Sequence, residues 1–64
     1  MYALEVHFPN EAVPRRVEVN RTAAGAMARI PELLREHDGC EKAVVYIGMT
    51  RLFSVDCRGN TTRD

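Results

Sequence analysis

The sequence predicts a single small α+β domain of ββαββ order, with one amphipathic helix packed on one face of a four-stranded sheet. Three observations support this fold class. Residues 2–8 and 13–19 alternate apolar with polar side chains, which is the period-two pattern of a half-buried strand. Residues 23–37 carry apolar side chains at intervals of three and four, as an amphipathic helix does. Residues 41–56 contain two apolar runs separated by a short segment that begins at Gly48, which is typical of a β-hairpin.

The first two strands are expected to form a hairpin through the turn at residues 9–12, where Pro9 and Asn10 favour a change of direction. Pro14 has no N–H to donate, so the second strand should lie at an edge of the sheet near its start. We expect the apolar residues of both strands to face the helix, namely Leu4, Val6, Phe8, Val17 and Val19. The opposite side then carries the polar residues Glu5, His7, Arg16 and Glu18 as a solvated surface.

The segment 23–37 is expected to form one helix, and either Asn20 or Thr22 is expected to cap its N-terminus. Pro31 conflicts with this helix, because an interior proline costs about 3 kcal/mol. The apolar pattern continues unbroken across Pro31, so we favour a kinked helix over a shorter one that begins at this proline. Gly39 is expected to form the C-terminal cap.

The second hairpin is the stretch around which the domain is organised, because each of its strands has apolar residues on both faces. A single helix covers one face of a sheet. If the inward-facing residues are Val45, Ile47, Phe53 and Val55, the outward-facing residues are Val44, Tyr46 and Leu52. A register shift exchanges the roles of Val44, Tyr46, Phe53 and Val55 with those of Val45, Ile47 and Leu52. In either case an apolar patch remains on the open side of the sheet.

Two cysteines flank the second hairpin. With a two-residue turn that begins at Gly48, Cys40 faces Cys57, whereas with a three-residue turn Cys40 faces Arg58. The first register also sets two acidic residues opposite each other, which costs energy. In both registers we expect reduced thiols, because directly opposed strand positions strain a disulfide and no feature of the sequence indicates an oxidising compartment.

The chain of 64 residues is expected to form one domain over residues 1–58, followed by a polar, frayed tail at residues 59–64. A domain of this size buries roughly 60% of the surface of its unfolded chain. Its stability therefore depends on regular local structure or on association with another chain.

The charge balance disfavours nucleic acid and acidic membranes as partners. Lys plus Arg equals Asp plus Glu at nine each, so the formal net charge is zero. The longest apolar run is shorter than the roughly 18 residues of a membrane span, and the N-terminal residues lack the pattern of a signal peptide. We therefore expect a cytoplasmic protein without membrane contact.

No segment carries catalytic or metal-binding chemistry, so we expect no enzymatic activity, no catalytic residue, no metal and no cofactor. His7 lies near Glu5 and Glu18 in the expected sheet, but an exposed histidine beside a carboxylate is common on strands. His37 lies at the end of the helix, where a cation complements the helix dipole. The two cysteines lack the CxxC spacing of a zinc site.

What remains is a binding module that presents a surface. The outward apolar residues, edged by charged ones, have the composition of an interface core with a charged rim. The expected partner-binding residues are Val44, Tyr46, Leu52, Arg51, Arg16 and Glu18. The partner is a protein of unknown identity, and a second copy in a homodimer is an alternative. In size and strand order the chain is similar to small phage-encoded inhibitors such as some anti-CRISPR proteins, which implies a viral or mobile-element inhibitor that binds a protein.

Two other functions are compatible with the sequence. A nucleic-acid-binding regulator would use arginines and aromatic residues on the sheet, namely Arg51, Arg58 and Arg63 with Tyr46 and Phe53. The zero net charge places this function second. A homo-oligomeric structural or accessory protein comes third.

Overall fold

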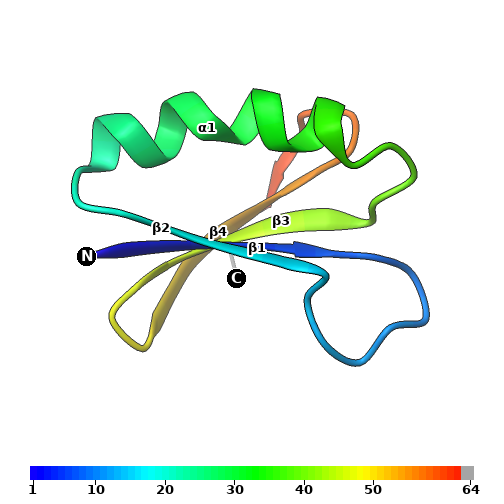
Figure 1. Ribbon diagram of the computed structural model, residues 1–64, viewed down its shortest axis with the longest axis horizontal. Helices are drawn as coiled ribbons and strands as arrows, with labels where there is room; N and C mark the ends of the chain where they lie inside the picture. The colour runs from blue at the N-terminus through cyan, green and yellow to red at the C-terminus, as the bar shows by residue number, and fades with distance from the viewer. Residues whose placement is uncertain (63–64) are drawn as a thin grey trace.

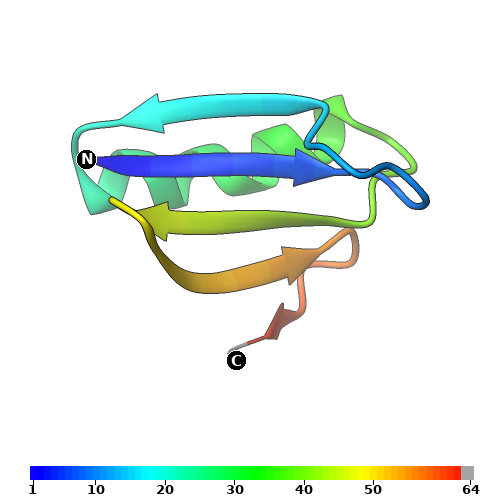
Figure 2. The same ribbon diagram turned by 90° about the horizontal axis from the view of Figure 1, so that it is seen from below.

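A computed structural model describes residues 1–62 and shows one helix packed on one face of a five-stranded antiparallel sheet (Figure 1). The strands are β1 (Tyr2–His7), β2 (Arg16–Asn20), β3 (Lys42–Ile47), β4 (Thr50–Asp56) and β5 (Thr61–Thr62), and the helix is α1 (Ala23–Glu36). The strand order is β2-β1-β3-β4-β5, and each neighbouring pair is antiparallel. Figure 2 shows β2 along one edge of the sheet and β5 at the other. The predicted α+β class is confirmed, and the fifth strand is the difference.

The fifth strand forms where the sequence predicts a frayed tail. The Asp56 carboxylate accepts backbone N–H groups from Arg58 at 2.9 Å and from Asn60 at 3.0 Å, and Gly59 has a φ of +89°. The resulting turn brings Thr61–Thr62 alongside β4. The hydrogen bond from Asn60, followed by that from Arg58, lowers the pKa of Asp56. Residues 63–64 of the expected tail lie outside the described residues.

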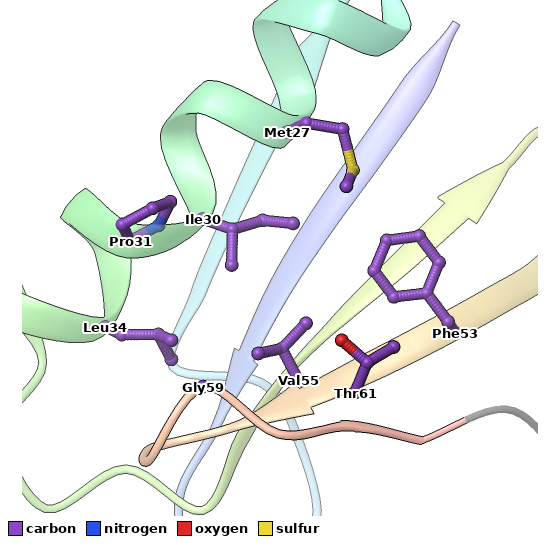
Figure 3. Close-up of a pocket in the computed structure, with 8 residues that line it drawn as sticks. All are labelled: Met27, Ile30, Pro31, Leu34, Phe53, Val55, Gly59 and Thr61. Atoms are coloured by element: carbon purple, nitrogen blue, oxygen red, sulfur yellow. The ribbon is translucent and has the colours of Figure 1, made fainter.

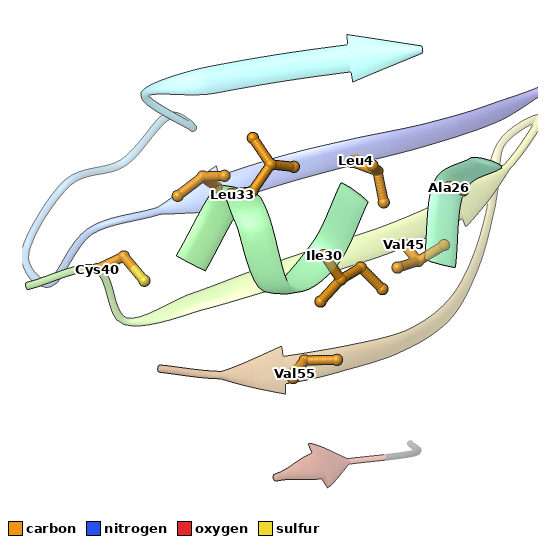
Figure 4. Close-up of a cluster of buried hydrophobic side chains, with 8 residues drawn as sticks. Leu4, Ala26, Ile30, Leu33, Cys40, Val45 and Val55 are labelled. Atoms are coloured by element: carbon orange, nitrogen blue, oxygen red, sulfur yellow. The ribbon is translucent and has the colours of Figure 1, made fainter. Parts of the chain in front are cut away.

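The hydrophobic core lies between α1 and the sheet (Figure 4). Its buried members are Leu4, Val6, Ala26, Ile30, Leu33, Cys40, Val45 and Val55. Leu4 and Leu33 are among the largest fully buried side chains, and each such burial contributes about 1.5–3 kcal/mol. The apolar side of the helix therefore packs on the predicted inner residues of β1, β3 and β4. The predicted inner residues of β2 are the exception.

The register of β2 is the main departure from the expected sheet. Leu4 is paired with Glu18, and Glu5 is paired with Val17. Residues directly opposite each other share a face, so Glu18 lies on the helix side and Val17 on the open side. The prediction that Val17 and Val19 face the helix is therefore wrong. In a strand, a shift of one residue moves every side chain to the other face, and the loop before β2 allows this shift.

The helix begins at the predicted cap. The hydroxyl of Thr22 accepts the backbone N–H of Gly25 at 3.0 Å. The helix continues through Pro31, so the alternative of a shorter helix that begins there is excluded. It ends at His37, whose backbone N–H donates to the Leu33 carbonyl at 3.1 Å. The C-terminal cap is therefore His37 rather than Gly39, which follows in the turn with a φ of +84°.

The second hairpin has a two-residue turn, the first of the two alternatives left open by the sequence, and an extra residue in β4. Ile47 pairs with Thr50 across the turn, and Gly48 has a φ of +59°. Farther along, Val45 pairs with Phe53, so Leu52 forms a β-bulge that shifts the register by one residue. The side chains of Val45, Phe53 and Val55 consequently face the helix, as the first of the two predicted arrangements requires.

The bulge also changes the ends of the hairpin. Asp56 pairs with Lys42, an opposite charge, instead of with Glu41. Cys40 and Cys57 lie just beyond the paired residues and are joined by a disulfide, with their Cα atoms 6.2 Å apart. The prediction of reduced thiols is therefore wrong, because the bulge removes the directly opposed geometry on which that prediction depended.

Candidate functional site

The face of the sheet that α1 does not cover is the candidate functional surface, and we call it the open face. Its members follow from the strand registers and are Ala3, Glu5, His7, Val17, Val19, Lys42, Val44, Tyr46, Arg51, Ser54 and Asp56. Four strands contribute to it, so distant parts of the chain meet there (Figure 2).

The exposed apolar surface of the open face comes chiefly from β2. Val17 and Val19 are 53% and 58% exposed. Val19, Ala3 and Tyr46 lie in one row across three strands, because Ala3 pairs with both of the others. We call Ala3, Val17, Val19 and Tyr46 the open-face patch. The sequence predicted a patch on this side of the sheet, but it assigned the two valines to the opposite side.

The expected centre of the patch lies in β3 and β4 and is less accessible. Val44 is only 2% exposed, between Glu5 on β1 and Ser54 on β4. Leu52 is 39% exposed at the bulge. Of the two, Leu52 therefore offers a partner much more apolar surface than Val44.

Polar side chains on and beside the open face are bonded to each other. His7 Nε2 lies 3.1 Å from Glu5 Oε1. The Arg51 guanidinium donates to the Ser54 hydroxyl at 3.3 Å. Glu18, which the sequence pattern predicts on the same side of the sheet as His7 and Glu5, lies on the other side. The three residues therefore do not form one cluster.

Arg16 and Glu18 belong to an ion-pair cluster on the helix side. The Glu18 carboxylate accepts hydrogen bonds from Arg29 at 2.9 and 2.7 Å and from Arg16 at 2.9 and 3.2 Å. Arg29 also donates to Glu32 at 3.1 Å and to Glu36 at 3.2 Å. The placement of Arg16 and Glu18 at the rim of the open face is therefore wrong.

The charges of this cluster shift its titration. The hydrogen bond from Arg29 is the largest cause that lowers the pKa of Glu18 from 4.5 to about 2, and Arg16 adds to it. The same carboxylate, followed by Glu36 and Glu32, raises the pKa of Arg29. The cluster ties β2 to α1, which is a structural role.

A second apolar surface lies between α1 and β4 (Figure 3). The residues that line this groove are Met27, Ile30, Pro31, Leu34, Phe53, Val55, Gly59 and Thr61, and its volume is about 270 Å³. The helix packs on β1, β2 and β3, and the inner side of β4 is therefore left partly uncovered. This groove could not be predicted from the sequence pattern, which does not indicate β5, the strand that supplies Thr61.

The described residues also bear on the predictions for metal and nucleic acid. Residues 1–62 contain no group of three or more His, Cys, Asp or Glu side chains that could hold a metal ion. Tyr46 and Phe53 lie on opposite faces of the sheet, since Phe53 pairs with Val45 and packs on the core. The aromatic pair expected for stacking nucleic-acid bases is therefore divided. Arg63 lies outside the described residues.

No helix within residues 1–62 is long and apolar enough to cross a membrane. Comparison with known protein families, curated proteins and solved structures gives no match to this chain. The features that bear on function are therefore the α+β fold, the open-face patch and the groove.

Proposed function

We propose that this chain is a non-enzymatic protein-binding module, a small inhibitor or regulator that contacts a protein partner through the open face of its sheet. The observation that carries the proposal is the pair Val17 and Val19, each more than half exposed on the face that α1 leaves uncovered, where Val19 lies in one row with Ala3 and Tyr46.

Single exposed apolar residues are normal on protein surfaces. A contiguous set on one rigid sheet is different, because its exposure costs free energy that binding a partner recovers. The open-face patch is edged by Glu5, which pairs with Val17, and by Arg51, which pairs with Tyr46. An apolar centre with a charged rim is the usual anatomy of a protein interface.

A phage or mobile-element inhibitor of the anti-CRISPR type is one example of this class, supported by the small size of the chain and its antiparallel sheet. Nucleic-acid binding is less well supported. The net charge is zero, and the two aromatic residues of the second hairpin lie on opposite faces.

The test compares partner capture by matched variants. Val17→Thr with Val19→Thr keeps the branched shape of both side chains but makes the patch polar. Val13→Thr is the control, because Val13 is an exposed valine outside the sheet. Met27→Gln tests the groove. Each tagged variant is incubated with host lysate, and captured proteins are cross-linked and identified.

The proposal expects a specific protein that wild type, Val13→Thr and Met27→Gln retain and that the double variant loses. Equal capture by the double variant, or selective loss with Met27→Gln, would contradict it. Thermal unfolding of each variant shows whether a loss of capture reflects loss of the fold.

A further inference from the structure

We infer that the outer edge of β2 is a self-pairing surface, through which two copies of this chain join antiparallel about a two-fold axis at Val17 and form one continuous sheet. This inference requires no foreign partner and goes beyond the proposed function.

The first observation is that the edge is open. β2 pairs with β1 on one side, and Figure 2 shows no other element of the described chain along its outer side. An edge strand presents unpaired backbone N–H and C=O groups that another strand can use. Proline is the usual block to such pairing, but Pro14 precedes β2 and the strand itself contains none.

The second observation is the charge pattern of the strand. Arg16 and Glu18 flank Val17 and lie on the helix side of the sheet. Antiparallel pairing about Val17 sets Arg16 opposite Glu18 of the second copy, and Glu18 opposite Arg16 of the second copy. Opposite charges facing each other across strands stabilise the pair.

The neighbouring register is disfavoured. Pairing about Glu18 sets this carboxylate directly opposite its own copy, and like charges at facing positions are destabilising. The strand is therefore complementary to itself in the register centred on Val17. Self-complementarity is what an interface related by a two-fold axis requires.

The third observation is the apolar side of the same strand. Pairing about Val17 sets the two copies of this residue side by side, and Val19 lies two positions away on the same face. Side chains that are more than half exposed in one chain thus gain contacts across the axis. The open faces of the two copies then form a single surface with both open-face patches near its centre.

The other edge does not offer the same pairing. β5 has two residues, both threonine, and carries no charge to set a register. The groove beside α1 is apolar, but no feature of it identifies an occupant. A second copy at β2 is therefore the occupant that the observations favour.

The experiment is sedimentation velocity over a range of protein concentrations. Arg16→Glu sets like charges opposite each other at both pairs, whereas Arg16→Lys keeps the charge. Arg35→Glu makes the same charge change on an exposed helix residue and is the control. We expect wild type, Arg16→Lys and Arg35→Glu to dimerise alike, and Arg16→Glu to bind itself about tenfold more weakly. High salt should weaken the wild-type dimer.

A second measurement locates the interface without any mutation. Amide hydrogen exchange at Val17 and Val19 should slow as the wild-type concentration rises. A strict monomer at every concentration would overturn the inference, as would a dimer that Arg16→Glu leaves unchanged or whose protected amides lie outside β2. Circular dichroism of Arg16→Glu checks that this variant is folded. Tyr46 belongs to the open-face patch but lies outside β2, so Tyr46→Ala should leave the dimer intact. Loss of dimerisation and loss of partner binding can therefore be measured separately.

Discussion

The guanidinium of Arg29 donates two hydrogen bonds to the carboxylate of Glu18, at 2.9 and 2.7 Å, and so joins the middle of α1 to the edge strand β2. The Glu18 side chain is 16% exposed. This pair accounts for a charged residue on the inner side of a strand, a position that the sequence pattern assigned to valine.

Glu18→Gln should lower the free energy of unfolding by about 1 kcal/mol at pH 7, since it removes a partly buried ion pair. The pKa of Glu18 falls from 4.5 to about 2 on folding. The contribution is therefore fully present above pH 4.5, and it is lost as the pH falls toward 2. Urea unfolding of wild type and variant at several pH values measures this difference.

Glu32→Gln is the matched control for that experiment, because Glu32 also accepts from Arg29 but its side chain is 51% exposed. We expect its effect to be smaller than that of Glu18→Gln. A pH-independent difference between wild type and Glu18→Gln would show that the ion pair does not stabilise the fold.

Cys57→Ser should lower the stability of the oxidised protein by about 3 kcal/mol, because the disulfide to Cys40 closes a loop across 17 residues. Cys57 is exposed, so the substitution itself removes little packing. Wild type in reductant should match the variant. Thiol titration of unfolded, unreduced wild type checks the pairing, and two reactive thiols per chain would contradict it.

Gly48→Ala should destabilise the fold by about 1 kcal/mol, because Gly48 has a φ of +59°, which disfavours residues with a Cβ. No heavy atom outside the neighbouring residues lies within 4 Å of the added Cβ, so the cost is conformational. Met49→Ala is the control, since Met49 is a fully exposed turn residue without a positive φ. Equal thermal stability of the two variants would argue against this turn.

Single-stranded DNA and RNA are expected to bind weakly even at low salt, because a chain without net charge neutralises few phosphates. Fluorescence anisotropy with labelled oligonucleotides measures this. Tight binding that is lost on Arg51→Ala and that weakens linearly with the logarithm of salt concentration would support the regulator function instead.

The second hairpin shows what local sequence determines. The glycine at position 48 specified the two-residue turn, since the left-handed conformation there favours glycine. The bulge at Leu52 could not be predicted, because it depends on cross-strand pairs each worth less than about 1 kcal/mol. One of them is the pairing of Asp56 with Lys42 in place of Glu41. The same register shift takes Cys40 and Cys57 out of directly opposed positions, so their disulfide could not be predicted either.

The face of β2 could not be predicted for a different reason. Its valines and its charged residues alternate equally well, so the pattern leaves two registers open. Arg29, which lies 11 residues after Glu18, is the partner that makes the charged side acceptable beneath the helix. The candidate site was therefore predicted as an open sheet face, but its most exposed residues were not.

The bulge at Leu52 has a consequence for how this chain tolerates insertions and deletions. Leu52 has no partner on β3, because Tyr46 pairs with Arg51 and the preceding residue of β3, Val45, pairs with Phe53. Deleting Leu52 would remove the bulge and leave Tyr46 paired with Arg51 and Val45 paired with Phe53, so Val55 would keep its place in the core. The connection at residues 8–15 lies outside the strands, so changes of its length leave the alternation of side chains in every strand intact. Length variation in related chains should therefore occur in that connection, and loss of a single residue from β4 should occur at Leu52.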